Sequence, residues 1–174
     1  MSINDWSCPG NLTVYGDLIP LSGISGSGTN IHQGLNSLAS ITTGENNTAI
    51  GYNSLNDLTT ASRITAVGSG ALQSLTTGAK NNAFGYNALG ALTTGTDNVA
   101  FGYLAGSNMT TASRNIAIGT EALSSLTADH NFHIAIGYRA LASLNGILGD
   151  SNIAIGAQAL ENNTDGYLNL AIGY

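Results

Sequence analysis

The triplet Ala-apolar-Gly recurs at nearly constant intervals along most of this chain. It occurs eight times from residue 49 onward, and the steps from one glycine to the next are 17, 17, 17, 17, 18, 19 and 17 residues. A degenerate unit precedes these at Gly34, where His32 and Gln33 replace the Ala-apolar pair. Self-similarity at a fixed period indicates a repeat architecture, and an atypical first unit is typical of a capping repeat.

A unit of this length is too short for the helix pairs of helical solenoids, but it suffices for one turn of a β-solenoid. Residues 81–86 alternate small and large side chains with the period of a strand. The leucines of residues 88–92 are three apart, which suits either a bent second strand or a single helical turn. We therefore predict an all-β fold in which the coils can include single helical turns. The expected architecture is a parallel β-solenoid or β-roll of about nine 17-residue coils.

Stacked coils place each side chain above its equivalent in the previous coil, so the repeat predicts ladders. The expected apolar ladder, buried with two leucine columns in a continuous interior, consists of Ile50, Val67, Phe84, Phe101, Ile118, Ile136, Ile155 and Ile172. Burial of each such side chain is worth roughly 1.5–3 kcal/mol. An asparagine ladder, hydrogen-bonded along the axis, is expected at Asn47, Asn81, Asn98, Asn115, Asn152 and Asn169. One slot upstream, Asp97 is expected between Lys80 and Arg114.

The other side of each predicted strand carries only small residues. A flat surface of this kind lets a second backbone approach closely, which favours a homo-oligomer. The interface candidates are Ala83, Gly85, Ala100, Gly102, Ala117 and Gly119. The alternative is that the small residues fit a tight corner inside a monomeric solenoid.

The repeat resembles two known groups of proteins. The segments 98–102, 115–119 and 152–156 are similar to the Asn-Ser-Val-Ala-Ile-Gly repeat in the head domain of YadA-type trimeric autotransporter adhesins. They also resemble the Ala-Ile-Gly-Tyr-x-Ala-Leu arrays of viral and phage tail-fibre proteins. The adhesin resemblance implies a left-handed parallel β-roll that associates as a trimer about a common axis, although the family's usual coil is shorter. The resemblance covers residues 30–174.

Residues 1–29 differ in kind from the repeats. Residues 11–18 alternate like a strand and resemble segments of phage structural proteins, and the Ser-Gly-rich run 22–28 reads as a flexible joint. We expect residues 1–29 to form an anchoring segment and hinge that binds a larger virion protein, and residues 30–174 to form the fibre. The N-terminus lacks a secretory signal pattern, which favours a virion protein over a bacterial surface adhesin.

Several other classes of function have little support in the sequence. Four basic residues in a chain of net charge −6 offer no patch for nucleic acid, and no apolar run is long enough for a membrane helix. No carboxylate pair, nucleophile elbow or phosphate loop stands out, so we expect neither an enzyme nor a cofactor. His130 and His133 are the one weak pair of metal-ligand candidates, and polar loop residues are the simpler interpretation.

Two rows of side chains raise the question of binding. Tyrosines follow the glycine at positions 52, 86, 103, 138 and 174 and would form either an exposed row for sugars or protein partners or half-buried packing, which we favour. Paired threonines invite comparison with ice-binding solenoids, which need flat ranks of outward hydroxyls. The expected function is a trimeric virion fibre that attaches to a host receptor or glycan. The alternatives are a bacterial trimeric adhesin and a monomeric ice- or glycan-binding solenoid.

Overall fold

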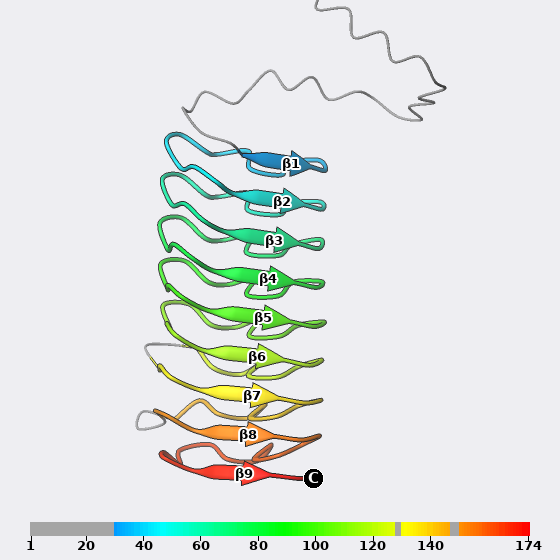
Figure 1. Cartoon of the computed structure of the whole chain (residues 1–174), viewed down its shortest axis with the longest axis vertical. Helices are drawn as coiled ribbons and strands as arrows, with labels where there is room; N and C mark the ends of the chain where they lie inside the picture. The colour runs from blue at the N-terminus through cyan, green and yellow to red at the C-terminus, as the bar shows by residue number, and fades with distance from the viewer. Residues whose placement is uncertain (1–29, 128–129, 147–149) are drawn as a thin grey trace, which may run out of the picture.

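The chain winds into a stack of similar coils, each of which contributes one short strand (Figure 1). The computed structural model describes residues 30–127, 130–146 and 150–174, so the predicted anchoring segment 1–29 lies outside the described residues. The strands are β1 (Ile31–Gln33), β2 (Thr48–Ile50), β3 (Thr65–Val67), β4 (Asn82–Phe84), β5 (Val99–Phe101), β6 (Ile116–Ile118), β7 (Ile134–Ile136), β8 (Ile153–Ile155) and β9 (Leu170–Ile172). They form one sheet in sequence order, and every pairing is parallel. The predicted parallel β-solenoid is confirmed.

The strands stack with equivalent residues opposite one another. Ile136 pairs with Ile118 on one side and Ile155 on the other, although the two steps are 18 and 19 residues long. The additional residues therefore fall in the connections between strands. A longer unit leaves the register of the sheet unchanged because the connection, and not the strand, absorbs the extra length.

The second half of each coil is neither a bent second strand nor a helical turn, the two alternatives that the leucine spacing left open. The described residues contain no helix, and no strand is found there. Asn87 and Leu89 both adopt left-handed backbone conformations, with φ of 51° and 52°. The N–H of Leu89 donates to the carbonyl of Ala105 in the next coil at 3.0 Å. A series of turns thus replaces a second strand and still bonds coil to coil.

Leucine rarely adopts positive φ, because its Cβ crowds the backbone, yet Leu55 and Leu72 also do so. Both side chains are fully buried, and the burial free energy offsets the backbone cost. The fifth coil has Gly106 at this position with φ of 59°, which explains the interruption in the leucine column.

The glycine after each strand is required by the stacking of coils. Gly51 has φ of 133°, and a Cβ on it would lie 2.5 Å from the carbonyl oxygen of Gly68 in the next coil. Neither the conformation nor the space admits a side chain. The regular spacing of glycines is therefore a condition for the regular rise of the solenoid.

Candidate functional site

The middle residue of each strand points into the coil. Ala83 and Ala100 are completely buried and Ala117 nearly so, packed in one cluster with the leucines of the opposite wall. These alanines cannot contact another chain, so their prediction as interface residues is wrong. The physical reason is that a thin coil whose far wall carries leucines has room only for a methyl group beneath the strand.

The three glycines predicted at the interface, Gly85, Gly102 and Gly119, are half-buried. The backbone that approaches them belongs to the next coil of the same chain: a Cβ on Gly85 would lie 2.3 Å from the carbonyl oxygen of Gly102. Their small size therefore serves the stacking of coils within the chain. All six predicted interface residues, three alanines and three glycines, therefore fit the alternative interpretation, in which small residues occupy tight places inside the solenoid.

The predicted apolar ladder exists, but it lies on the outside. The register pairs Ile50 with Val67, Phe84 with Phe101, and so on to Ile172. The prediction that this ladder fills the interior is wrong: Ile50 is 38% exposed, Phe101 57% and Ile118 36%. Because side chains alternate along a strand, burial of the middle alanine places the first and third residues outside.

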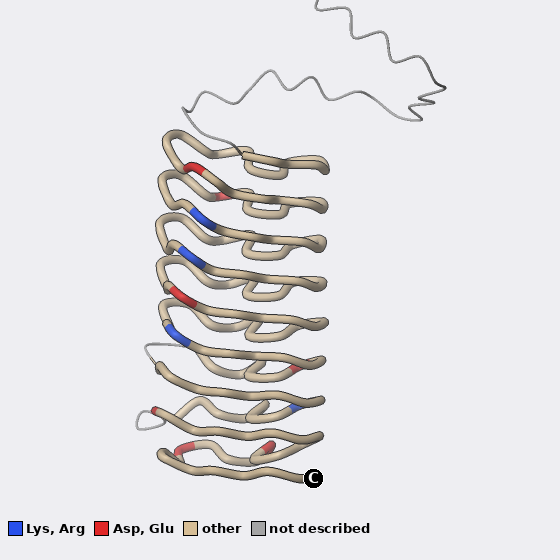
Figure 2. The backbone as a smooth tube through the Cα atoms, viewed as in Figure 1, with Lys and Arg blue, Asp and Glu red and all other residues tan. Residues whose placement is uncertain are grey.

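The outward residues make a continuous surface, which we call the apolar face. It consists of the first strand residues Ile31, Thr48, Thr65, Asn82, Val99, Ile116, Ile134, Ile153 and Leu170, and the third strand residues Gln33, Ile50, Val67, Phe84, Phe101, Ile118, Ile136, Ile155 and Ile172. None of these is charged. Lys, Arg, Asp and Glu lie on the connections between strands (Figure 2).

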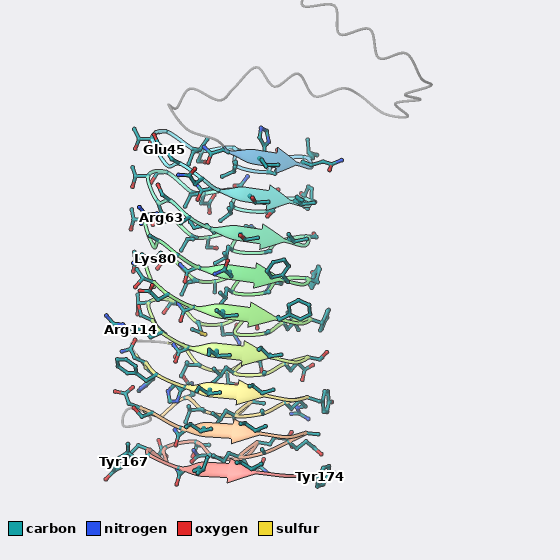
Figure 3. The ribbon with its side chains drawn as sticks, viewed as in Figure 1. Glu45, Arg63, Lys80, Arg114, Tyr167 and Tyr174 are labelled. Carbon is teal, nitrogen blue, oxygen red and sulfur yellow. The ribbon has the colours of Figure 1, made fainter. Side chains whose placement is uncertain are left out.

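A row of tyrosines borders the apolar face. Tyr52, Tyr86, Tyr103 and Tyr138 are each about half exposed, and Tyr174 projects at the far end of the rod (Figure 3). The rings of Tyr86 and Tyr103 stack with centroids 5.4 Å apart, and those of Phe84 and Phe101 lie 5.6 Å apart. Tyr86 and Tyr103 thus pack on each other, and the row also presents aromatic surface to solvent.

The asparagine ladder is confirmed and lies in the interior. The amide oxygen of Asn81 accepts the backbone N–H of Asn98 at 3.0 Å, and Asn98 in turn accepts that of Asn115 at 3.0 Å. The amide NH₂ of Asn98 donates to the carbonyl of Ala112 at 2.8 Å. Each asparagine therefore satisfies backbone groups that the turn leaves unpaired, which burial would otherwise penalise.

His133 occupies an asparagine position of this ladder and is completely buried. Its backbone N–H donates to the amide oxygen of Asn115 at 2.9 Å, and its Nδ1 accepts the backbone N–H of Asn152 at 3.2 Å. No described residue pairs with its Nε2. Burial lowers the pKa of His133 from 6.5 to about 4; the Asp150 carboxylate opposes this shift and His130 adds to it. The neutral imidazole thus replaces an amide.

His130, the other weak metal-ligand candidate, has its Nδ1 3.5 Å from a carboxylate oxygen of Asp150. The part of the chain that the structure describes has no group of three His, Cys, Asp or Glu side chains that could hold a metal ion. With the Nδ1 of His133 engaged by Asn152, the two histidines form part of the connection between coils.

Lys80 and Arg114, on the connections, each have a partner in the next coil. Lys80 lies 3.9 Å from Asp97, as expected, whereas Arg114 lies over the ring of Phe132, 5.3 Å from its centroid. Asp97 is therefore ion-paired with Lys80, one of its two predicted partners. Such exposed pairs contribute little to stability.

Arg139 joins three coils, which the sequence did not predict. Its Nη1 lies 2.9 Å from Glu161, and its Nε lies 3.4 Å from Glu121, without the geometry of a hydrogen bond at Nε. Glu121 and Arg139 both stand two residues after a repeat glycine, so the period carried a signal for this pair, whereas Glu161 stands five residues after Gly156.

The paired threonines do not form two free ranks. The hydroxyls of Thr59, Thr76 and Thr93 donate to carbonyl groups of the next coil at 2.9–3.0 Å. In these three pairs only the second threonine, Thr60, Thr77 or Thr94, is exposed. A single rank of outward threonines is not the flat double rank that an ice-binding surface needs.

No family model matches this chain, and neither the curated proteins nor the solved structures contain a significant match. In the described ranges, no helix has the length and apolar character needed to cross a membrane. The apolar face, which was not predicted from the sequence, runs along every described strand and is available to bind a partner.

Proposed function

We propose that this chain is a non-catalytic structural rod that associates as a homotrimer into a fibre or spike of a virion, of a phage tail or capsid. The apolar face is the observation that carries the proposal, because it runs along every strand and bears no charge. A soluble protein rarely leaves such a surface in water.

The size of the face suits self-association. With outward residues about 6.6 Å apart and strands about 4.8 Å apart, the face and the tyrosine row measure about 13 Å by 38 Å, or on the order of 500 Å² in projection. Each partner in a standard interface contributes about 800 Å² of accessible surface, which exceeds the projection because side chains are corrugated. A second and third copy of the chain would cover the face without leaving an apolar strip in solvent.

Three copies and a viral particle are favoured by the resemblance of the repeats to trimeric adhesin heads and viral tail fibres. A long, narrow rod with a distinct N-terminal segment suits a fibre anchored through residues 1–29 and projecting outward. The tyrosine row lies at the border of the face, so the ring surface that the other copies leave uncovered is available to a host receptor or glycan. A bacterial trimeric adhesin would use the same rod in a different place.

Mass spectrometry and immunogold labelling of purified virions test the role. We expect the chain in the particle at a fixed ratio to the other structural proteins, with label on projections. Its absence from particles, together with labelling of a bacterial surface, would replace the virion fibre by the bacterial adhesin.

A further inference from the structure

The tyrosine row has a regular pattern of rings and gaps along the rod. Its position comes directly after each strand glycine, and some coils carry a smaller side chain there. In the order of strands β1 to β9, the residues at this position are Leu35, Tyr52, Ser69, Tyr86, Tyr103, Thr120, Tyr138, Ala157 and Tyr174. Successive tyrosines are therefore either one coil or two coils apart.

The two-coil separation recurs on each side of the stacked rings of Tyr86 and Tyr103. Parallel strands lie about 4.8 Å apart, so Tyr52 and Tyr86 are offset by about 9.6 Å along the axis. Tyr103 and Tyr138 are offset by the same amount, because the longer connection leaves the strand register unchanged. The row thus contains two sets of equally spaced rings, Tyr52 with Tyr86 and Tyr103 with Tyr138, which we call the tyrosine pairs.

Polar side chains accompany the tyrosine pairs. Asn53, Asn87 and Arg139 each come directly after a tyrosine of these pairs, and all three are partly exposed. Leu104, after Tyr103, is the exception. The row therefore combines aromatic rings with amide and guanidinium groups that can form hydrogen bonds.

This combination matches the chemistry of a pyranose sugar with equatorial substituents. Such a sugar has apolar C–H groups on the faces of its ring and hydroxyl groups around its edge. The faces pack on aromatic rings, and the hydroxyls bond to amide and guanidinium groups. A protein partner needs no such alternation of rings and polar groups, and the broader apolar face suits it better.

The spacing within each pair selects an extended sugar polymer. In a cellulose-type polymer, each glucose advances the chain by roughly one coil spacing and is turned over relative to the one before. Alternate sugars therefore present the same face to one side of the chain. A sugar and the next but one then meet the two rings of one pair.

We propose that each tyrosine pair binds a stretch of about three sugars in the main chain of an unbranched, cellulose-type polysaccharide that lies along the rod axis. The inference rests on the glycan contact in the proposed function and gives that contact a position, a ligand class and a length. The two pairs are one coil out of step, because Tyr86 and Tyr103 belong to neighbouring coils. Each pair is therefore a separate site.

Isothermal titration calorimetry with short oligosaccharides tests the ligand class. Cellotriose should bind at millimolar concentrations, and several-fold more tightly than cellobiose, which cannot reach both rings of a pair. Maltotriose holds the same glucose units in an α-linked, curved chain and should bind clearly less. Absence of cellotriose binding at millimolar concentrations would overturn the inference, and so would equal binding of the two trisaccharides.

Alanine substitutions test the site. Tyr52→Ala combined with Tyr138→Ala removes one ring from each pair and should weaken cellotriose binding by about two- to tenfold. Tyr167→Ala is the matched control, since this tyrosine is similarly exposed but lies on the opposite side of the rod from Tyr174 (Figure 3). Circular dichroism should show both variants folded, because the removed rings are at least half exposed. Binding that survives the double substitution, or falls equally in the control, would overturn the tyrosine pairs as the site.

Light scattering on the same samples separates this inference from the proposed function. A trimer that does not bind cellotriose would overturn the inference and leave the proposed fibre intact. A single chain that binds cellotriose through the tyrosine pairs would support the inference and overturn the self-association.

Discussion

The backbone N–H of Asn152 donates a hydrogen bond to the Nδ1 of His133, where other coils use an asparagine amide oxygen. Because Nδ1 accepts, the neutral imidazole carries its proton on Nε2. Protonation of Nδ1 would place two donors against each other in a buried site. The ladder at this coil therefore depends on a neutral histidine, whereas an amide is neutral at every pH.

This relationship predicts a loss of stability in acid. The pKa of His133 falls from 6.5 in the unfolded chain to about 4 in the folded chain, so the unfolded chain binds more protons between these values. The free energy of unfolding should therefore have its full value above pH 6.5. It should decline by up to about 3 kcal/mol as the pH falls toward 4. Urea unfolding at several pH values measures it.

The control restores the ladder. His133→Asn puts the repeat's usual residue at this position and removes the titrating group, so its unfolding free energy should vary less between pH 7 and pH 4.5. An equal decline in both proteins would assign the acid sensitivity to carboxylates elsewhere.

Glycines after the strands should tolerate no side chain. Gly85→Ala places a Cβ 2.3 Å from the backbone oxygen of Gly102 at φ of 138°, and should cost at least about 3 kcal/mol or prevent folding. Gly70→Ala is the matched change, since its nearest neighbour is the side-chain oxygen of Asn87 at 3.3 Å. It should cost only about 1 kcal/mol. Thermal unfolding compares them, and similar losses would contradict the stacking argument.

Neighbouring positions on one strand should separate folding from association. Ala117→Leu overfills the interior and should lower the unfolding free energy by about 1–3 kcal/mol or more, because the alanine is almost completely buried. Ile118→Lys puts a charge on the apolar face and should leave the coil folded while it prevents association. Circular dichroism together with sedimentation distinguishes these outcomes, and a folded, monomeric Ala117→Leu variant would restore the alanines as interface residues.

The cluster around Arg139 should make a small, salt-dependent contribution. Arg139→Met removes the contacts to Glu161 at 2.9 Å and Glu121 at 3.4 Å from a side chain that is 39% exposed. The expected loss is under about 1 kcal/mol at low salt and smaller at high salt. Chemical unfolding at two salt concentrations measures it, and a loss that does not depend on salt would indicate a packing role instead.

The period of the sequence was enough to predict the solenoid, because equal steps between glycines can be met only if equivalent residues stack. It also predicted the asparagine ladder, since amides stacked at one position of successive coils can hydrogen-bond along the axis. The prediction of which strand residues face the interior was wrong. Large side chains at both Ile116 and Ile118 flank Ala117, and we assigned the larger residues to the interior, although the leucine columns alone fill it.

The turns of the second half could not be predicted from propensity. Leu89 and Leu141 have positive φ, which leucine rarely adopts, and here burial and coil-to-coil hydrogen bonds offset the cost. Local sequence therefore favoured a strand or helical turn that the stacked coils override. The pair of Arg139 and Glu121 could have been predicted, because both residues stand two after a repeat glycine, whereas Glu161 stands at a different repeat position and could not.

The central claim is that the apolar face holds copies of the chain together. The molar mass of the intact protein in native buffer, measured by light scattering beside Ile118→Lys and a control Thr60→Lys on an exposed turn, tests it most directly. We predict three times the 17.6 kDa chain mass for the unmodified protein and for Thr60→Lys, and 17.6 kDa for Ile118→Lys. A mass of 17.6 kDa for the unmodified protein at every concentration would contradict the account.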